Sequence, residues 1–489
     1  MLSGIYPILS CDEARVFEQG YLAKDEALEW KAMRRAGRGI AEAVLRDFEE
    51  IGGLPASARV LVLAGKGNNG GDALLAAAEL RVCCPRIEVE VVFAFGERAL
   101  RPLAQRAWRE LAAADASVRT REVGDLTEGY DLCLDGVFGY QYRAPLPPEV
   151  GVLLARVNAL PVRLRAAVDL PSGLDAKDAF QADFSYATGS VKAPLFTLPN
   201  AGRLRLIDLG FPVVGQSIKD TVLGAEVLAP LRALRSPQSD KRTFGHLLVI
   251  AGSQWYPGAA LMAVSAAVRS GAGLVTAAVP QSLAAVFAAR LPEVMWLGLP
   301  ETPGGELSQD GIGLLRTAVS RATAVLIGPG IGRSRDTISL ALQFVRGCPV
   351  PIVIDADALH SDVIVAGTGA RILTPHAGEY ERIQGRIPPA AIVVRKGPIS
   401  GIEVGTGGPS RVSLFGGPVL ARGGSGDLLA GLMAGLLAQT PDDPSGAAER
   451  GLVWHGLAAD ALARKHGQVA VATTQLLDFL GPVLRNSQA

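Results

Sequence analysis

Apolar runs of strand length alternate with helical segments along this chain, and the alternation limits the folds open to it. Strand-like runs cover residues 59–64, 88–95, 130–134 and 165–168, and a second series begins at residue 247. Segments of helical periodicity separate these runs. This order is typical of mainly parallel sheets with helices on both faces, in which ligands bind beyond the carboxyl ends of the strands.

The pattern weakens between the two series, and the break predicts a domain boundary. Residues 221–238 hold two prolines and two arginines around one short apolar patch. We therefore predict two doubly wound α/β domains, residues 1–220 and 239–489, joined by a linker of residues 221–238.

Charge and cysteine content exclude several classes of protein. Lys+Arg and Asp+Glu both total 48, so we expect no nucleic-acid partner. The five scattered cysteines favour a reducing cytoplasm. Residues 247–268 are uncharged over a membrane-spanning length, but Gly252 and Pro257 interrupt them. We therefore expect a buried strand, turn and helix there, and no membrane partner.

Residues 65–72 of the first half, Gly-Lys-Gly-Asn-Asn-Gly-Gly-Asp, form its main motif. They fit the dinucleotide fingerprint G-x-G-x-x-G, with Glu88 and Glu90 placed to bind a ribose. The two adjacent asparagines and Asp72 favour another use, because they place amide groups and negative charge where a pyrophosphate would lie. Both a ligand site and plain turn and cap residues remain open for this motif.

Three oxygen-bearing side chains follow neighbouring predicted strands. They are Asn69, Asp135 and Ser172, the last within Asp169-Leu-Pro-Ser-Gly-Leu-Asp175. Amide, carboxylate and hydroxyl oxygens are hard donors that suit an alkali or alkaline-earth cation.

The first half resembles the NAD(P)H-hydrate epimerase family through residues 65–72, 131–135, 168–175 and Lys192. That family interconverts the R and S forms of hydrated NAD(P)H and carries a potassium ion. The resemblance implies that Asn69, Asp135 and Ser172 hold K⁺ and that Asp169 transfers the proton. It also implies hydrate contacts from Asn68, Asn69, Gly70, Gly71, Asp72, Gly139, Tyr140, Gln141, Tyr142, Arg143, Ala144, Pro145 and Asp169. This chain has Ala73 and Tyr140-Gln141 where the family has Gly and Thr-Gly.

Residues 422–427 of the second half, Arg-Gly-Gly-Ser-Gly-Asp, precede an apolar run of helix length. Three glycines at a helix N-terminus can cradle a phosphate. An aspartate there makes sense as a base for a hydroxyl that attacks the phosphate, or simply as a helix cap. Further strand-end motifs lie at 328–332, 355–358, 374–379 and 396–397. The Walker motif G-x-x-x-x-G-K-[ST] is absent, so these features favour phosphoryl transfer without a Walker lysine.

This half resembles the ribokinase-like superfamily and, within it, the ADP/ATP-dependent NAD(P)H-hydrate dehydratase family. The shared motifs include Gly258-Ala-Ala260, Gly328-Pro-Gly330, residues 374–379 and residues 423–427. The resemblance implies hydrate contacts from Ala259, Gly330, His376 and Asp427, with Asp427 as the catalytic base. It implies that a nucleotide, ADP with Mg²⁺, binds Lys396, Gly397, Pro398, Ile399, Ser400, Gly417, Gly423, Gly424, Ser425 and Gly426.

Together the resemblances imply an N-terminal Rossmann-like three-layer sandwich, an isomerase, fused to a C-terminal ribokinase-like lyase. Such a chain repairs hydrated NAD(P)H, because the epimerase supplies the S form that the dehydratase consumes while converting ADP to AMP and phosphate. Its expected partners are NAD(P)H hydrates and ADP, and we expect a homo-oligomer. The alternative is a ribokinase-like small-molecule kinase with a non-catalytic N-terminal binding domain.

Overall fold

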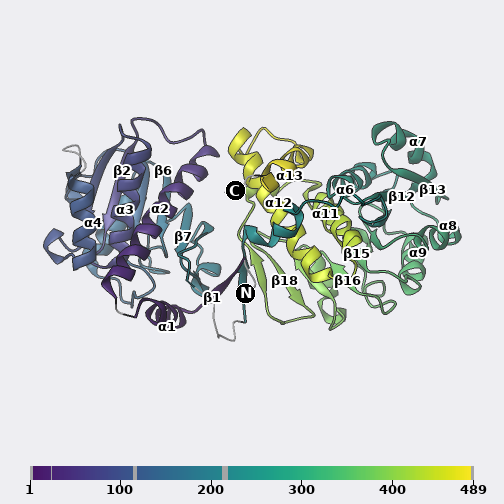
Figure 1. The fold of residues 1–489 in the computed structure, drawn as a ribbon, viewed down its shortest axis with the longest axis horizontal. Helices are drawn as coiled ribbons and strands as arrows, with labels where there is room; N and C mark the ends of the chain where they lie inside the picture. Colours follow the sequence, from purple (N-terminus) through teal and green to yellow (C-terminus); the bar gives the residue numbers. More distant parts are fainter. Residues whose placement is uncertain (1–3, 24, 114–117, 212–218, 486–489) are drawn as a thin grey trace. The chain divides into compact units, whose positions relative to one another are not determined.

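The computed structural model describes residues 4–23, 25–113, 118–211 and 219–485 (Figure 1). The chain forms two compact units. The N-terminal unit comprises Tyr6–Ile218 and Ala463–Gln468, and the C-terminal unit comprises the remaining segments. The predicted first domain, residues 1–220, includes residues 212–218, which lie outside the described part of the chain.

The N-terminal unit is built on a seven-stranded parallel sheet in the order β4-β3-β2-β5-β6-β7-β9. Its strands are β2 (Arg59–Ala64), β3 (Glu88–Phe93), β4 (Arg119–Thr120), β5 (Tyr130–Gly136), β6 (Val162–Val168), β7 (Phe184–Thr188) and β9 (Arg203–Ile207). The chain runs from β2 outward through β3 and then returns to β5 on the other side of β2. The strand order therefore reverses between β2 and β5, the position where open parallel sheets bind ligands.

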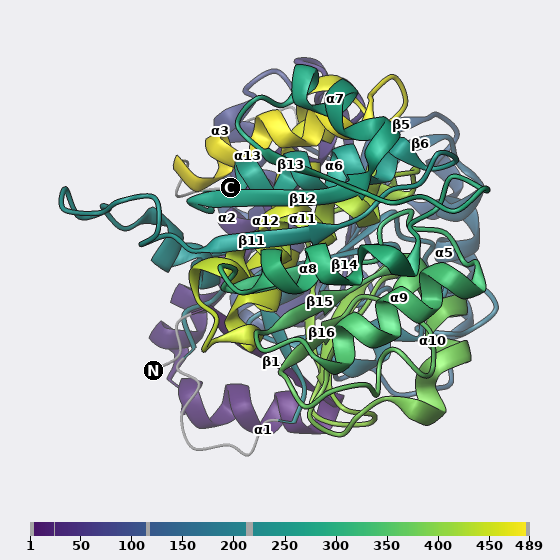
Figure 2. The ribbon, with the colours of Figure 1, turned by 90° about the vertical axis from the view of Figure 1, so that its right-hand side faces the viewer.

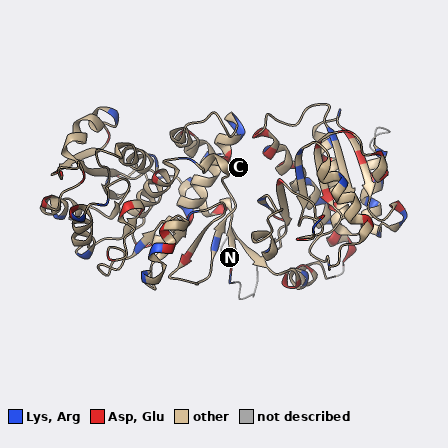
Figure 3. Ribbon diagram, turned by 180° about the vertical axis from the view of Figure 1, so that it is seen from behind, with Lys and Arg blue, Asp and Glu red and all other residues tan. Residues whose placement is uncertain are grey.

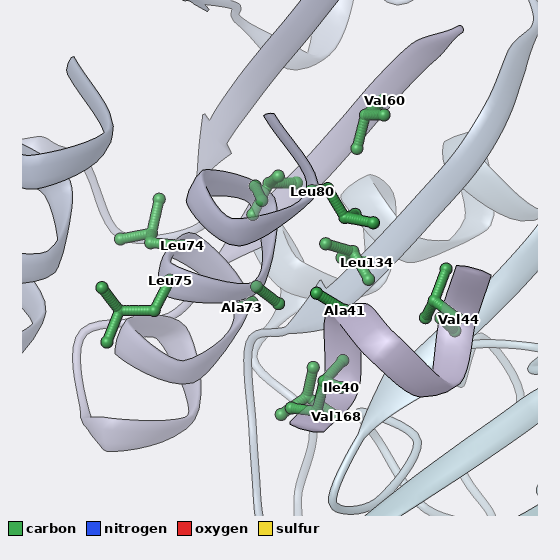
Figure 4. Close-up of a cluster of buried hydrophobic side chains, with 14 of the residues drawn as sticks. Ile40, Ala41, Val44, Val60, Ala73, Leu74, Leu75, Leu80, Leu134 and Val168 are labelled. Atoms are coloured by element: carbon green, nitrogen blue, oxygen red, sulfur yellow. The ribbon is translucent and has the colours of Figure 1, made fainter. Parts of the chain in front are cut away.

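Helices cover both faces of this sheet because its buried strands carry apolar side chains on both sides. Val60 and Val62 of β2 belong to a core with helices α2 (Glu26–Glu49), α3 (Asn68–Cys83) and α4 (Pro102–Ala113), part of which is drawn in Figure 4. Leu61 and Leu63 belong to the opposite core, with α5 (Pro148–Ala159). The predicted α/β class is confirmed.

Two features of the N-terminal unit differ from expectation. Helix α3 begins at Asn68 rather than near residue 73, so the asparagines form its first turn instead of a preceding loop. Strand β1 (Ile5–Leu9) and helix α1 (Cys11–Leu22) were not predicted, although Ser10 and Glu13 form a capping box at the start of α1. Strand β1 pairs in parallel with β8 (Val191–Lys192).

The sheet of the C-terminal unit has the order β13-β12-β11-β14-β15-β16-β17-β18-β19-β10. Strands β13 to β17 run parallel, and β18 is antiparallel to both of its neighbours. The strands are β10 (Thr221–Leu223), β11 (His246–Ile250), β12 (Leu274–Pro280), β13 (Met295–Leu299), β14 (Ala324–Ile327), β15 (Ile352–Ile354), β16 (Arg371–Leu373), β17 (Ile392–Arg395), β18 (Ser400–Val404) and β19 (Arg411–Ser413). Here the strand order reverses between β11 and β14.

Helices α8 (Ile312–Val319), α9 (Arg335–Arg346) and α10 (Ala377–Ile383) share a core with strands β11, β14 and β15 (Figure 2). Helices α6 (Pro257–Arg269) and α11 (Ser425–Gln439) pack tightly against each other. A Cβ on Gly431 would lie 2.0 Å from the carbonyl oxygen of Ala263, so only glycine permits this approach. The close packing fixes the N-terminal end of α11, which carries the glycine-rich motif.

The predicted linker contains regular structure. Residues 221–223 form β10, which pairs in parallel with β19, and Ala225–Arg232 form a 3₁₀ helix with Leu228 buried. The apolar part of the predicted linker therefore packs as part of the C-terminal unit.

The distribution of charged residues and the state of the cysteines follow what the composition predicts. Acidic and basic residues are interspersed over both units in Figure 3, and all five cysteines are free thiols. Among the described residues, no helix combines the length and the apolarity needed to cross a membrane.

Core packing on α3 gives a stability prediction. Leu80 is fully buried against β2 and α2, whereas Val82 on the same helix is 76% exposed. Leu80→Ala is expected to lower the free energy of unfolding by about 3 kcal/mol, because it leaves a cavity in a packed core. The control Val82→Ala is expected to change it by less than about 0.5 kcal/mol. Urea denaturation of both variants measures the difference, and equal effects would contradict the packing described here.

Candidate active sites

A cavity of about 350 Å³ lies at the carboxyl ends of β2, β5 and β6 in the N-terminal unit. Ten of the predicted hydrate contacts line it: Asn68, Asn69, Asp72, Gly139, Tyr140, Gln141, Tyr142, Arg143, Pro145 and Asp169. Gly70, Gly71 and Ala144 are not among its lining residues. Gly70 and Gly71 serve packing, since a Cβ would lie 2.1 Å from the Gly65 carbonyl oxygen and 2.6 Å from Met33 Sδ respectively.

Asp169 follows β6 directly. One of its carboxylate oxygens has three contacts with polar groups, and the other has a single hydrogen bond from a described residue. Its backbone has φ of 66°, a conformation that side chains seldom adopt. Oδ1 lies 2.6 Å from Lys192 Nζ and accepts hydrogen bonds from the backbone and hydroxyl of Thr188. Oδ2 accepts only the Tyr140 backbone N–H, at 3.3 Å, among the described residues. Oδ2 is therefore the oxygen able to exchange a proton with a ligand in the cavity.

Lys192 is fully buried behind this carboxylate. Its ammonium group also donates to the carbonyl oxygens of Thr188 and Ser190, and it lies 3.6 Å from Glu18 Oε1. Burial acts to lower the pKa of Lys192, but Asp169 and Glu18 outweigh burial and raise that pKa above its ordinary value. Lys192 is therefore a permanent cation beside the Asp169 carboxyl group.

Glu18 of α1 also lines this cavity, and no motif in the sequence pointed to it. The Tyr140 hydroxyl donates to Glu18 Oε2 at 2.7 Å. Burial raises the pKa of Glu18, and Asp169 adds to the rise while Lys192 opposes it. Burial likewise raises the pKa of Asp72 well above its ordinary value, with contributions from Asp169 and Glu18.

The three predicted cation ligands gather around the backbone of Phe138, beside the cavity. The Ser172 backbone and hydroxyl donate to the two oxygens of Asp135, and Phe138 N–H donates to Ser172 Oγ. The Asn69 amide donates to the Phe138 carbonyl oxygen. Asp135 is fully buried and forms no ion pair with a described residue, and burial raises its pKa to about 6. A buried carboxylate without a counter-charge, beside hydroxyl and amide oxygens, fits a monovalent cation.

Glu88 and Glu90 do not bind a ribose in this fold, so that prediction is wrong. Both lie in the first half of β3, whereas the cavity lies at the carboxyl ends of the strands. Glu90 instead pairs with Arg121 at 2.8 Å and accepts a hydrogen bond from the Tyr130 hydroxyl. The dinucleotide fingerprint placed the acids by their distance along the sequence and missed the direction of the strand.

In the C-terminal unit, a second lysine–aspartate pair adjoins the glycine-rich helix, with its aspartate buried and its lysine part-buried. Lys396, which follows β17, lies with its Nζ 2.8 Å from Oδ1 of Asp355, which follows β15. The Thr374 hydroxyl donates to the same oxygen at 2.6 Å. A Cβ on Gly426, in the first turn of α11, would lie 3.2 Å from Lys396 Nζ. The lysine thus reaches the helix N-terminus predicted to bind phosphate.

Asp427, in the first turn of α11, has the titration behaviour of a general base. Burial raises its pKa to about 7, and Asp355 contributes to this rise while Lys396 opposes it. A carboxylate with a pKa near neutrality combines good basicity with a substantial ionised fraction at physiological pH.

Gly330 and Ala259 come together, while His376 stands at the start of α10. Gly330 has φ of 63°, and a Cβ there would lie 2.9 Å from that of Ala259. His376 accepts the Glu379 backbone N–H and is 61% exposed, so its ring is open to a ligand. The Lys396 backbone N–H donates to the Pro375 carbonyl oxygen, which ties His376 to the lysine.

The predicted nucleotide contacts lie on turns near the start of α11. Residues 397–400 form a turn closed by the Ser400 hydroxyl, which accepts Gly397 N–H at 3.3 Å. Gly417 precedes a short 3₁₀ helix, Pro418–Leu420, and the Ser425 hydroxyl donates to the Leu420 carbonyl oxygen. Gly424 has φ of 88°, which permits the sharp entry into the helix.

Comparison with known proteins assigns each half. Residues 247–481 match the family model for NAD(P)H-hydrate dehydratase, and residues 30–193 match that of the YjeF-related protein N-terminus. The bifunctional NAD(P)H-hydrate repair enzyme of Moorella thermoacetica is 33% identical, over 93% of this chain and 92% of its own. The chain belongs to the bifunctional NAD(P)H-hydrate repair enzymes. It therefore combines an epimerase half with a dehydratase half.

A second bifunctional repair enzyme agrees with this assignment. The Mycobacterium tuberculosis repair enzyme is 32% identical over 88% of both chains. Among solved structures, the ADP/ATP-dependent NAD(P)H-hydrate dehydratase from Bacillus subtilis, co-crystallised with ATP and Mg²⁺, is 28% identical. It covers 52% of this chain and 93% of its own, with a TM-score of 0.44.

Proposed function

We propose that the N-terminal cavity epimerises the hydrate and that Asp427 drives its dehydration in the C-terminal unit. The observation that carries the proposal is the lysine–aspartate contact in each unit, whose aspartate is buried and which adjoins a carboxyl oxygen open to a ligand. The free thiols are consistent with a reducing cytoplasm, and a homo-oligomer stays a prediction.

For dehydration, we propose ADP as the phosphoryl donor, held by residues 396–400, Gly417 and residues 423–426. The oxygen of the hydrate hydroxyl attacks the β-phosphate of ADP, and AMP leaves. Asp427 accepts the proton of that hydroxyl during the attack. The Lys396 ammonium group and the N-terminus of α11 stabilise the developing negative charge. Breakage of the C–O bond then releases phosphate, and the adjacent ring carbon loses a proton to solvent, which forms the C=C bond and restores the dihydronicotinamide. Ala259, Gly330 and His376 orient the hydrate.

Mg²⁺ fits this site as an ion carried by the nucleotide. The described residues contain no group of three acidic, histidine or cysteine side chains arranged to hold a metal. Asp355 is already paired with Lys396, and Asp357 with Arg333. An ion bound mainly by phosphate oxygens and water, as Mg²⁺ commonly is, needs no such group.

For epimerisation, we propose that Oδ2 of Asp169 exchanges the proton at the hydrate. Asn68, Asn69, Asp72, residues 139–145 and Asp169 surround the ligand in this proposal, with Gly70 and Gly71 shaping the turn. K⁺ would be held by Asn69, Asp135 and Ser172, where it compensates the buried charge of Asp135 and fixes the Phe138 peptide at the wall of the cavity.

Asp427→Asn is expected to lower the dehydration rate about a thousandfold, because the amide cannot accept a proton. Nucleotide affinity should stay within a few-fold, and the wild-type rate should rise with pH through about 7 as Asp427 ionises. S-hydrate dehydration and calorimetric nucleotide binding measure both effects. The matched control is Asp442→Asn, an exposed acid beyond the end of α11. Loss of nucleotide binding with retained turnover would refute the assignment.

Asp169→Asn is expected to abolish epimerisation while S-hydrate dehydration continues at the wild-type rate. Asparagine tolerates positive φ, so the variant removes the charge with little backbone strain. Chromatographic separation of the R and S forms, without ADP, follows the reaction. Asp175→Asn, at the exposed end of the same motif, is the control. If Asp169→Asn still equilibrates the two forms, Asp169 is not the proton-transfer residue.

A further inference from the structure

The epimerase cavity contains one more carboxyl group than a single proton-transfer residue requires. Lys192 Nζ lies 2.6 Å from Asp169 and 3.6 Å from Glu18, so one ammonium group serves two carboxyl groups. Both line the same cavity, together with Asp72. A buried and a part-buried carboxylate beside one cation leave surplus negative charge, which a retained proton removes.

Tyr140 connects the two carboxyl groups. Its backbone N–H donates to Asp169 Oδ2, and its hydroxyl donates to Glu18 Oε2, so one residue contacts both carboxyl groups. The Tyr140 ring also lies over Lys192, with Nζ 5.2 Å from the ring centroid. The two carboxyl groups therefore approach the cavity from different elements, α1 and the end of β6, and are held at a fixed spacing.

The two carboxyl groups have different surroundings. Oδ1 of Asp169 is contacted by three donors, including the ammonium group at 2.6 Å. Glu18 lies farther from the ammonium group, and burial raises its pKa. Such a divergence between neighbouring carboxyl groups is how an enzyme keeps one acid and one base at the same pH.

We propose that Glu18 is a second proton-transfer residue of the epimerase, the acid that acts with Asp169 as the base on the two faces of the hydrate. This inference rests on the proposed role of Asp169 and extends it. Nothing in the motifs that predicted the site included Glu18.

The reaction balances with these two groups alone. Neutral Glu18 donates its proton to the hydroxyl oxygen as the C–O bond breaks, and the bonding electrons leave with water. The lone pair of the ring nitrogen forms a C=N⁺ bond. A water molecule then adds to the opposite face, the nitrogen regains its lone pair, and the proton lost from that water passes to Asp169 Oδ2. In the reverse reaction Asp169 is the acid and Glu18 is the base. After each turnover, proton exchange with solvent returns Glu18 to its neutral form and Asp169 to its carboxylate.

Other charged groups also act on this titration. Asp72 and Cys11 lie near the cluster, and Glu29, Lys66, Arg101 and Arg143 line the rest of the cavity. Because they are present in wild type and variants alike, a change of pH profile confined to Glu18 substitutions identifies the Glu18 carboxyl group.

The test uses the full chain without ADP, with R-hydrate as substrate and the uncatalysed rate subtracted. Glu18→Gln is expected to lower kcat for epimerisation about 100-fold with KM within about twofold, because the amide cannot supply the proton. The wild-type pH profile of kcat is expected to be bell-shaped, and its fall at high pH reports ionisation of the acid, Glu18. In Glu18→Gln this fall at high pH should be lost. Glu18→Asp should recover part of the rate and the fall at high pH. The control Glu26→Gln, an exposed acid at the start of α2, should behave as wild type.

Two further measurements separate the possible failures. In ¹⁸O-water, each inversion should introduce one label into the hydrate; inversion without label would overturn the mechanism. If Asp169→Asn abolishes epimerisation while Glu18→Gln keeps the rate and both pH limbs, this inference fails and the role of Asp169 stands. If neither substitution matters, the proposed site itself fails. Thermal unfolding of Glu18→Gln and Glu18→Asp establishes that both variants are folded.

Discussion

An ion pair between a lysine and a buried strand-end aspartate lies at the centre of each unit's candidate site. Lys192 holds Asp169 at 2.6 Å in the first unit, and Lys396 holds Asp355 at 2.8 Å in the second. Breaking such a pair would leave an uncompensated buried charge, at a cost of about 3–5 kcal/mol. Each ammonium group is therefore already committed to one aspartate, and it offsets the burial of neighbouring carboxyl groups only in part. Burial raises the pKa of Glu18, and it raises the pKa of Asp427 to about 7, so Asp427 can exchange a proton near neutral pH.

The parallel sheets explain why a lysine–aspartate pair occurs in both halves of the chain, although the halves show no sequence repeat. The carboxyl ends of adjacent parallel strands lie at one edge of each sheet. The strand order reverses between β2 and β5 in the first sheet and between β11 and β14 in the second, and ligands bind at such positions. The two units use the pair differently. Asp169 itself faces the cavity through Oδ2, which accepts one backbone hydrogen bond, whereas Asp355 stays buried behind Lys396 and Asp427 is presented by the first turn of α11. The two reactions proposed above, proton transfer at the hydrate oxygen and phosphoryl transfer, would draw on the same electrostatic arrangement.

The sequence predicted the fold class and most strand-end motifs, because apolar periodicity and glycine-rich turns are local signals. It could not predict contacts made only by folding. Glu18 lies on a helix with ordinary surface patterning and reaches the cavity through the packing of α1. Gly70 and Gly71 belong to the right motif but pack against Gly65 and Met33. The ribose role of Glu88 and Glu90 failed because spacing along a chain does not reveal which end of a strand a residue occupies.

The central claim is that both units are active and that the first feeds the second. The direct test is the dihydronicotinamide absorbance recovered from an R/S hydrate mixture with the full chain, ADP, Mg²⁺ and K⁺. The account predicts complete recovery, since epimerisation converts the R form into the S form that dehydration consumes. Recovery that stops when the original S form is spent would contradict the claim for the N-terminal unit. No recovery with either ADP or ATP would contradict it for the C-terminal unit and favour a kinase that releases a stable phosphorylated product.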